Sequence, residues 1–112
     1  MPLTAENVGD VAIVTIPGKS LDSGNSRDFK AEIAPIVAAH RKLVFDLAEL
    51  TFVDSSGLGA ILSCLRKANA DGGDLKLCGL SKPVRALFEL VRMHRIFEIL
   101  NTREEAIRSF GG

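Results

Sequence analysis

The stretch Phe52-Val53-Asp54-Ser55-Ser56-Gly57-Leu58-Gly59 marks the passage from a predicted strand to a predicted helix, and the rest of the chain is arranged around it. An acid followed by two hydroxyl residues is a strong helix-start signal, because their side-chain oxygens accept the free N–H groups of the first turn. Two glycines nevertheless fall in that turn, where each costs roughly 0.5–1 kcal/mol relative to alanine. This helix start thus combines favourable capping residues with unfavourable first-turn residues. Such departures from ordinary helix preferences are typical of strained or functional positions.

Strand-like and helix-like segments alternate on both sides of this stretch. The predicted strands are a β-branched run at 11–16, a short partner for it near 3–8, and apolar runs at 43–47 (resumed at 52–53), 75–78 and 96–100. The predicted helices cover 26–40, the segment from the caps at 54–56 to a Gly-Gly stop at 71–73, the segment from Ser81 through Val91, and a closing helix capped at 101 or 102 and running through 110. This alternation predicts βαβ crossovers and a largely parallel sheet, with a hairpin at the beginning.

Three details of these segments are specific enough to be checked. Residues 19–25 are polar and are predicted to form a turn. Pro35 removes a backbone hydrogen bond from the first helix, which predicts a kink or a break there. Ser81 is predicted to cap the third helix, whose apolar stripe ends with Val91.

Length and composition indicate one soluble domain over residues 1–112. Of the 112 residues, 46% are hydrophobic and 25% charged, and the net charge is zero. Such a balance gives no bulk attraction to nucleic acid or to an anionic membrane. The sequence has no secretory signal pattern and no run of about 18 apolar residues, so we expect no membrane insertion and a cytoplasmic protein. Cys64 and Cys78 lie in apolar surroundings and are predicted to be reduced core residues.

The familiar catalytic and cofactor motifs are missing from the sequence. His40 and His94 lack metal-ligand spacing, so no metal site is predicted. No dinucleotide fingerprint, phosphate loop or nucleophile elbow is present, so we expect no cofactor and no enzyme activity. A weak nucleotide-binding or hydrolase activity around Ser55 stays as an alternative, and hydrolysis that disappears in Ser55→Ala would support it.

Two interpretations of the hydroxyl pair stay open from the residues themselves. Asp54, Ser55 and Ser56 can serve only as helix caps. Alternatively, the small residues leave the first turn bare, so that the active site of another protein reaches the Ser55 hydroxyl. A phosphate there would add about −1.5 to −2 charges, favoured by the helix N-terminus and opposed by Asp54 and by Asp22 if it is nearby.

A family resemblance favours the second interpretation. The stretch from Leu50 to Leu62, continued by residues 72–78 and 83–88, resembles the signature of the STAS domains of bacterial anti-sigma-factor antagonists. The resemblance implies an α/β fold, a single STAS-like domain with a mixed, largely parallel sheet of about five strands and about four helices. It also implies that Ser55 is the phospho-acceptor. The partner-binding surface expected around it consists of Asp22, Asp54, Ser56, Gly57 and Leu58.

The resemblance also implies a partner. Members of the family bind an anti-sigma factor that is itself an ATP-dependent serine kinase. The unmodified antagonist releases the sigma factor, phosphorylation breaks the complex, and a phosphatase resets it. One departure concerns partner choice, because Lys19-Ser20 stands where relatives often have an acidic residue before the Leu-Asp pair.

Two further possibilities stay open. A constitutive STAS scaffold, as a subunit of a transporter or a signalling complex, would use the same surface without the phosphate, and the apolar Leu58, Val91 and Met93 would then matter more than Ser55. The C-terminal third is basic, and its cations form either a solvated helix face or a docking patch for an acidic partner. These cations are Lys82, Arg85, Arg92, Arg95, Arg103 and Arg108.

Overall fold

The computed structural model describes residues 1–111 and contains the strands and helices in the predicted alternating order. In chain order the elements are β1 (Thr4–Val8), β2 (Val11–Thr15), β3 (Ser20–Leu21), α1 (Ser26–Ala39), β4 (Lys42–Asp46), β5 (Phe52–Val53), α2 (Ser55–Ala70), β6 (Asp74–Cys78), α3 (Lys82–Leu90), the 3-10 helix η1 (Met93–Arg95), β7 (Ile99–Leu100) and α4 (Arg103–Ser109).

The main sheet has five strands in the order β1-β2-β4-β6-β7. Its first pair is the predicted antiparallel hairpin, and every following pair is parallel. The central segments of β2 and β4 are buried on both faces, as expected for parallel strands covered by helices. The predicted mixed, largely parallel α/β fold with four helices is therefore confirmed.

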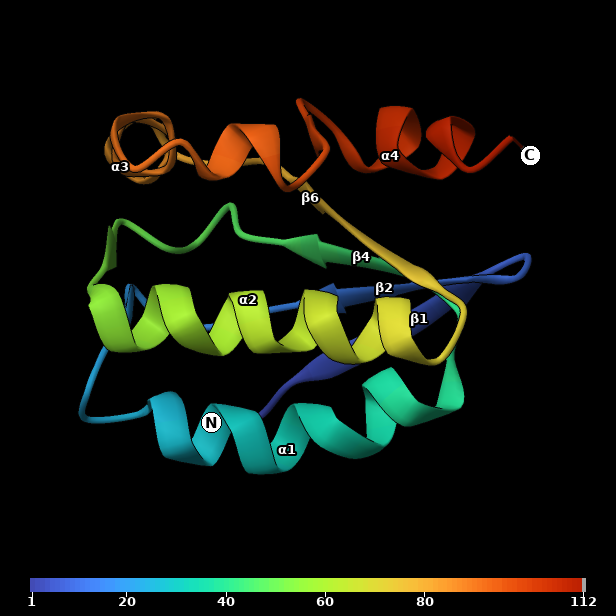
Figure 1. Ribbon diagram of the computed structural model, residues 1–112, viewed down its shortest axis with the longest axis horizontal. Helices are drawn as coiled ribbons and strands as arrows, with labels where there is room; N and C mark the ends of the chain where they lie inside the picture. Colours follow the sequence, from blue (N-terminus) through green and yellow to red (C-terminus); the bar gives the residue numbers. More distant parts are fainter. Residues whose placement is uncertain (112) are drawn as a thin grey trace.

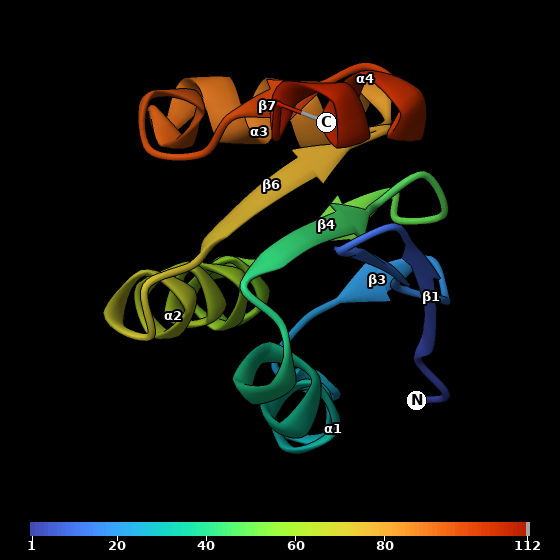
Figure 2. The same cartoon turned by 90° about the vertical axis from the view of Figure 1, so that its right-hand side faces the viewer.

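Helices cover both faces of this sheet. Helices α1 and α2 lie side by side and run in the same direction, so their N-terminal ends are at the same end of the molecule (Figure 1). Helices α3 and α4 lie on the side opposite α1 (Figure 2). The larger core lies against α1 and α2 and includes the edge-to-face pair Phe29 and Phe45. A smaller core, with Val44, Cys78 and Ala106, lies under α4.

The predicted break at Pro35 is absent, and the predicted turn at 19–25 contains a short strand. Helix α1 does not break at Pro35 but continues to Ala39; Pro35 is exposed, so water can reach the carbonyl that loses its partner. Within the predicted turn at 19–25, Ser20 and Leu21 form strand β3. This strand pairs with β5 in a separate two-stranded parallel sheet. A two-residue strand has no periodicity of its own and depends on its distant partner.

The C-terminal half differs from expectation in smaller ways. Ser81 occupies the N-cap position of α3, but its hydroxyl donates to the carbonyl of Leu50 at 2.6 Å instead of capping the helix. Val91 lies beyond α3 and is exposed. The predicted strand at 96–100 is reduced to Ile99 and Leu100, because the backbone N–H groups of 96 and 97 bond back to Met93 in a helical turn.

Among the helices of residues 1–111, none has the length and apolarity needed to cross a membrane.

Candidate functional site

The site begins at Asp54, which is the N-cap of α2 as predicted. One carboxylate oxygen accepts the backbone N–H of Gly57 at 2.9 Å. The other accepts the backbone N–H of Ser23 at 3.0 Å, across 31 residues of sequence. Asp54 therefore fixes the first turn of α2 and also joins it to the loop between β3 and α1.

These hydrogen bonds determine the ionisation of Asp54. The Gly57 N–H lowers the pKa of the carboxyl most, the partial burial of the group acts in the opposite direction, and the Ser23 N–H lowers it further. The pKa of Asp54 therefore lies below its ordinary value of 3.8, and the side chain is an anion at neutral pH. A negative charge thus stands beside the first residue of α2.

Asp22 lies in the loop that Asp54 holds. Its carboxylate accepts the Ser20 hydroxyl and the Gly24 backbone N–H, both at 2.8 Å. Because the residue after Asp22 is the one bonded to Asp54, the two acidic residues lie at the same end of the domain. The structure thus brings together two carboxylates that are far apart in the sequence.

Ser55 and Ser56 are the first two residues of α2, and both are exposed. Neither hydroxyl makes a hydrogen bond to another side chain or backbone group within the described part of the chain. Ser63, two turns further along the helix, differs because its hydroxyl donates to the Gly59 carbonyl at 3.0 Å. The caps of α2 are therefore provided by Asp54, and the hydroxyl of Ser55 is left available for chemistry.

The two glycines of the first turn have different roles. Gly57 was expected on the partner-facing surface, but it is buried, and a Cβ there would collide with the backbone carbonyl of Leu21. Gly57 is thus needed for the close approach of α2 to β3. Gly59 has open space around its Cα and leaves the surface beside Ser55 bare. Leu58 is half-buried against the larger core, so it offers only part of its side chain to a partner.

An open hollow of about 700 Å³ lies between the beginning of α1 and the first three turns of α2. Three basic residues line it, Arg27 and Lys30 from α1 and Arg66 from α2. The other lining residues are mainly small or hydroxylic: Ser23, Ser26, Ser55, Ser56, Gly59, Leu62 and Ser63. Sequence reasoning missed the basic residues, because they lie on the polar faces of two helices and only the packing of α1 against α2 places them beside Ser55.

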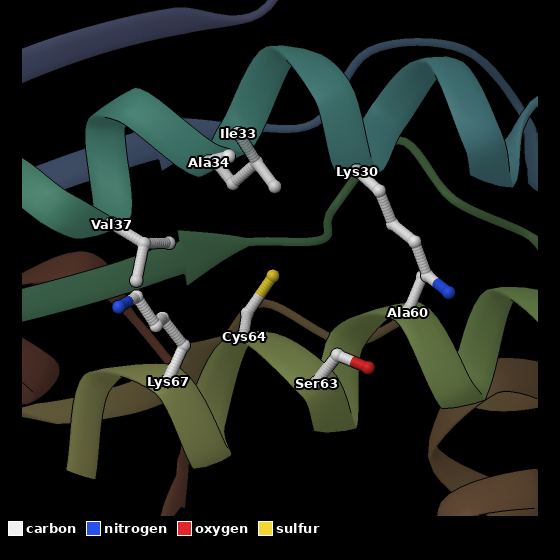
Figure 3. Close-up of a pocket in the computed structure, with 8 residues that line it drawn as sticks. All are labelled: Lys30, Ile33, Ala34, Val37, Ala60, Ser63, Cys64 and Lys67. Carbon is white, nitrogen blue, oxygen red and sulfur yellow. The ribbon is translucent and has the colours of Figure 1, made fainter. Parts of the chain in front are cut away.

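A smaller hollow of about 190 Å³ continues between the same two helices. Ile33, Val37 and Cys64 give it an apolar lining, with the Cys64 sulfur pointing toward Ile33, and Lys30 and Lys67 lie at its rim (Figure 3). Lys30 belongs to both hollows. The groove between α1 and α2 is therefore polar and cationic near Ser55 and apolar further along.

The family model of the STAS domain matches residues 2–106 of the chain. The chain belongs to the STAS domain family. This STAS domain is 32% identical over 111 residues to BtrV of Bordetella bronchiseptica, which is named as an anti-sigma factor antagonist, and the match covers 98% of this chain and 95% of that protein.

Solved structures agree with this assignment. The STAS domain superposes on the crystal structure of a Thermotoga maritima protein, also named as an anti-sigma factor antagonist, with a TM-score of 0.87 and 27% identity, covering 96% of this chain and 92% of the other. It superposes on the phosphorylated form of the Bacillus cell fate determinant SpoIIAA with a TM-score of 0.71 and 25% identity, covering 97% and 99% of the two chains.

The basic C-terminal third of this STAS domain does not act as one patch. The Arg103 guanidinium is already paired with acidic side chains of the sheet, with its Nε 2.6 Å from Asp46 and its Nη1 3.2 Å from Glu6. Arg85 donates to the side chain of Asn101 at 3.3 Å. The other cations of this region are exposed, at Lys82, Arg92, Arg95 and Arg108. A docking patch in the C-terminal third would therefore not include Arg103.

Cys64 and Cys78 are free and buried, as expected for core residues. Burial raises the pKa of each thiol to about 12. Within residues 1–111, no group of three or more His, Cys, Asp or Glu side chains is arranged to hold a metal ion.

Proposed function

We propose that this STAS domain is an anti-sigma factor antagonist whose partner is an anti-sigma factor with serine kinase activity. With Ser55 unmodified, the domain binds that partner and so frees a sigma factor. The kinase transfers the γ-phosphoryl group of ATP to the Ser55 hydroxyl, ADP leaves, and the complex separates. Hydrolysis of the phosphate by a cognate phosphatase restores binding. The phosphorylated residue is supplied by this chain and the catalysis by the partners.

The observation that carries the proposal is the position of Ser55. Its hydroxyl is exposed at the first residue of α2, while the capping of that helix is done by Asp54. Gly59 leaves the approach to it open. The names of the relatives support the antagonist role, and a structural relative at 25% identity exists in a phosphorylated form.

Electrostatics explains how the phosphate would act. A phosphoserine adds about −1.5 to −2 charges at neutral pH. At position 55 that charge would stand next to the anionic Asp54 and at the same end of the domain as Asp22. A partner surface that fits the unmodified site would meet a strongly changed potential without any refolding of the domain, and like charges across an interface cost several kcal/mol.

Phosphorylation by candidate anti-sigma kinases tests the first half of the proposal. The chain is incubated with each kinase and ATP, and the phosphate is located by mass spectrometry. We expect the wild type to be phosphorylated, and also Ser56→Ala, which removes the neighbouring hydroxyl but keeps that of Ser55. We expect no phosphorylation of Ser55→Ala. Absence of phosphate on Ser55 with every cognate kinase overturns the switch.

Binding to the unmodified kinase tests the second half. Calorimetry should give a loss of binding by a few kcal/mol for Ser55→Asp, because the new charge lies at the interface. Ser55→Ala should bind constitutively in the presence of ATP. Asn69→Asp is the matched control, since it adds the same charge at an exposed position near the other end of α2. Equal losses of binding free energy for Ser55→Asp and Asn69→Asp would show that the effect comes from net charge and not from the position of the charge.

A constitutive scaffold is the second candidate, and one observation favours it. Leu90, Val91 and Ile96 are exposed by 79%, 42% and 53% at the end of α3 and just after it. Leu58 and Met93 are half-buried against the larger core, so this patch is the stronger apolar candidate. In this case Leu90→Ser would abolish capture of the partner while Ser55→Asp would leave it unchanged.

A further inference from the structure

The cations of the hollow beside Ser55 have no acidic partner. Arg27, Lys30 and Arg66 line it, and no acidic side chain does. All three are exposed, and none takes part in an ion pair within residues 1–111. In a chain of zero net charge, three unpaired cations around one hollow form a local excess of positive charge.

The packing of α1 and α2 sets which cation lies at the level of Ser55. The helices run in the same direction, and Lys30 lies across from Ala60 (Figures 1 and 3). Arg27 is about one turn nearer the beginning of α1, and Ser56 is about one turn nearer the beginning of α2. Arg27 is therefore level with the hydroxyl pair. Arg66 is eleven residues beyond Ser55, about 16 Å along the helix, and closes the far end of the hollow.

We propose that Arg27 and Lys30 hold the phosphate of phosphorylated Ser55 inside this hollow, so that modification fills the cationic groove from within the same chain. This inference rests on the proposed function, since it concerns the state that the kinase would produce. It assigns to α1 a part in the switch, in addition to the site at the start of α2.

The chemistry of the hollow suits a phosphate. An arginine offers a planar pair of N–H donors that matches two phosphate oxygens, and a lysine adds a mobile point charge. The volume of about 700 Å³ leaves room for the group and its water. Asp54 stands next to Ser55 and Asp22 lies at the same end of the domain, so their charges oppose the phosphate and the cations of the hollow offset them. The phosphate would at the same time cancel the positive potential that the unmodified groove offers to a partner.

Titration of the phosphate itself tests this assignment. The full chain is prepared with phosphoserine incorporated at position 55 during synthesis, so no kinase is needed. The second pKa of the phosphate is then followed by ³¹P NMR between about pH 4 and pH 8, around the ordinary value of about 6. Nearby cations favour the dianion and lower this pKa, whereas Asp54 and Asp22 raise it equally in all variants.

We expect the second pKa to rise by about 0.5 to 1 in the double variant R27Q/K30Q, because the cations that favour the dianion are gone. Arg66→Gln should give a smaller rise. Arg108→Gln, which removes an exposed cation from α4, should give none. The difference in the second pKa between the wild type and R27Q/K30Q should become smaller as the salt concentration is raised, because salt screens exposed ion pairs. Far-ultraviolet circular dichroism checks that the exposed substitutions leave the fold intact.

Two results overturn the inference. The first is a second pKa that is the same in the wild type and in R27Q/K30Q. The second is an equal rise in R27Q/K30Q and Arg108→Gln, which would reflect net charge alone. Neither result bears on whether a kinase modifies Ser55, and a kinase that ignores Ser55 leaves the titration unaffected, so the two proposals fail separately.

Discussion

Gly57 of α2 lies directly against the backbone carbonyl of Leu21 in β3, with no room for a side chain between them. This contact holds the beginning of the helix against the short second sheet. It also places the loop after β3, with Asp22, next to the N-cap of α2. The shape of the candidate site depends on it.

Gly57→Ala should therefore destabilise the domain. The added methyl group has to displace backbone atoms, and overpacking of this kind costs about 1–3 kcal/mol, more than the alanine gains in helix propensity. Gly59→Ala is the matched control two residues away, where a Cβ meets open space, and it should stabilise by about 0.5–1 kcal/mol. Urea unfolding measures both. Similar free energies of unfolding for the two variants would contradict the close contact.

Protonation of Asp54 should lower the stability of the domain in acid. The folded-state pKa of Asp54 lies below the ordinary value of 3.8, so its contribution is complete above that pH and is lost as the pH falls through the folded-state pKa. Asn also caps helices, so Asp54→Asn keeps the cap and removes the charge. The difference in Tm between wild type and Asp54→Asn should be largest near pH 7 and shrink below about pH 4. A constant difference across that range would show that the carboxylate is not involved.

Arg103 should matter for stability although it lies in the basic third of the chain. It binds Asp46 of β4 and Glu6 of β1, and it donates to the Thr15 hydroxyl of β2 at 2.6 Å. Arg103→Met leaves the half-buried Asp46 without its cation, which should cost about 1–3 kcal/mol. Arg108→Met, on the same helix but exposed, should cost much less. Thermal unfolding of Arg103→Met and Arg108→Met measures both effects. Equal Tm values would contradict a stabilising role of the Arg103 contacts.

The thiols of Cys64 and Cys78 should be nearly inert in the folded protein. Burial raises each pKa from 9.0 to about 12, so at pH 8 the reactive thiolate is about 10³-fold rarer than for a free thiol. Ellman's reagent should label the native chain slowly and label it fully in denaturant. Fast labelling of the native chain would mean that the groove between α1 and α2 opens to expose Cys64.

Local sequence signals predicted most of the fold because they act within one turn or one strand. The β-branched run at 11–16 predicted β2, the apolar runs at 43–47 and 75–78 predicted β4 and β6, and the cap residues with the Gly-Gly stop predicted both ends of α2. These signals failed where the partner is distant. Strand β3 exists because β5 pairs with it, and Pro35 is tolerated because it faces solvent.

By itself, the sequence determined the alternation of the main-sheet strands with the helices, the largely parallel sheet and the position of Ser55 directly after the cap of a helix, since each follows from neighbouring residues. Only the tertiary structure decided that Gly57 is buried, that Asp54 binds the N–H of Ser23 31 residues away, and that Arg27 and Lys30 share a hollow with Ser55. The physical reason is that these contacts join elements far apart in the chain. The spacing of residues along one helix does not determine which face of another helix packs against it.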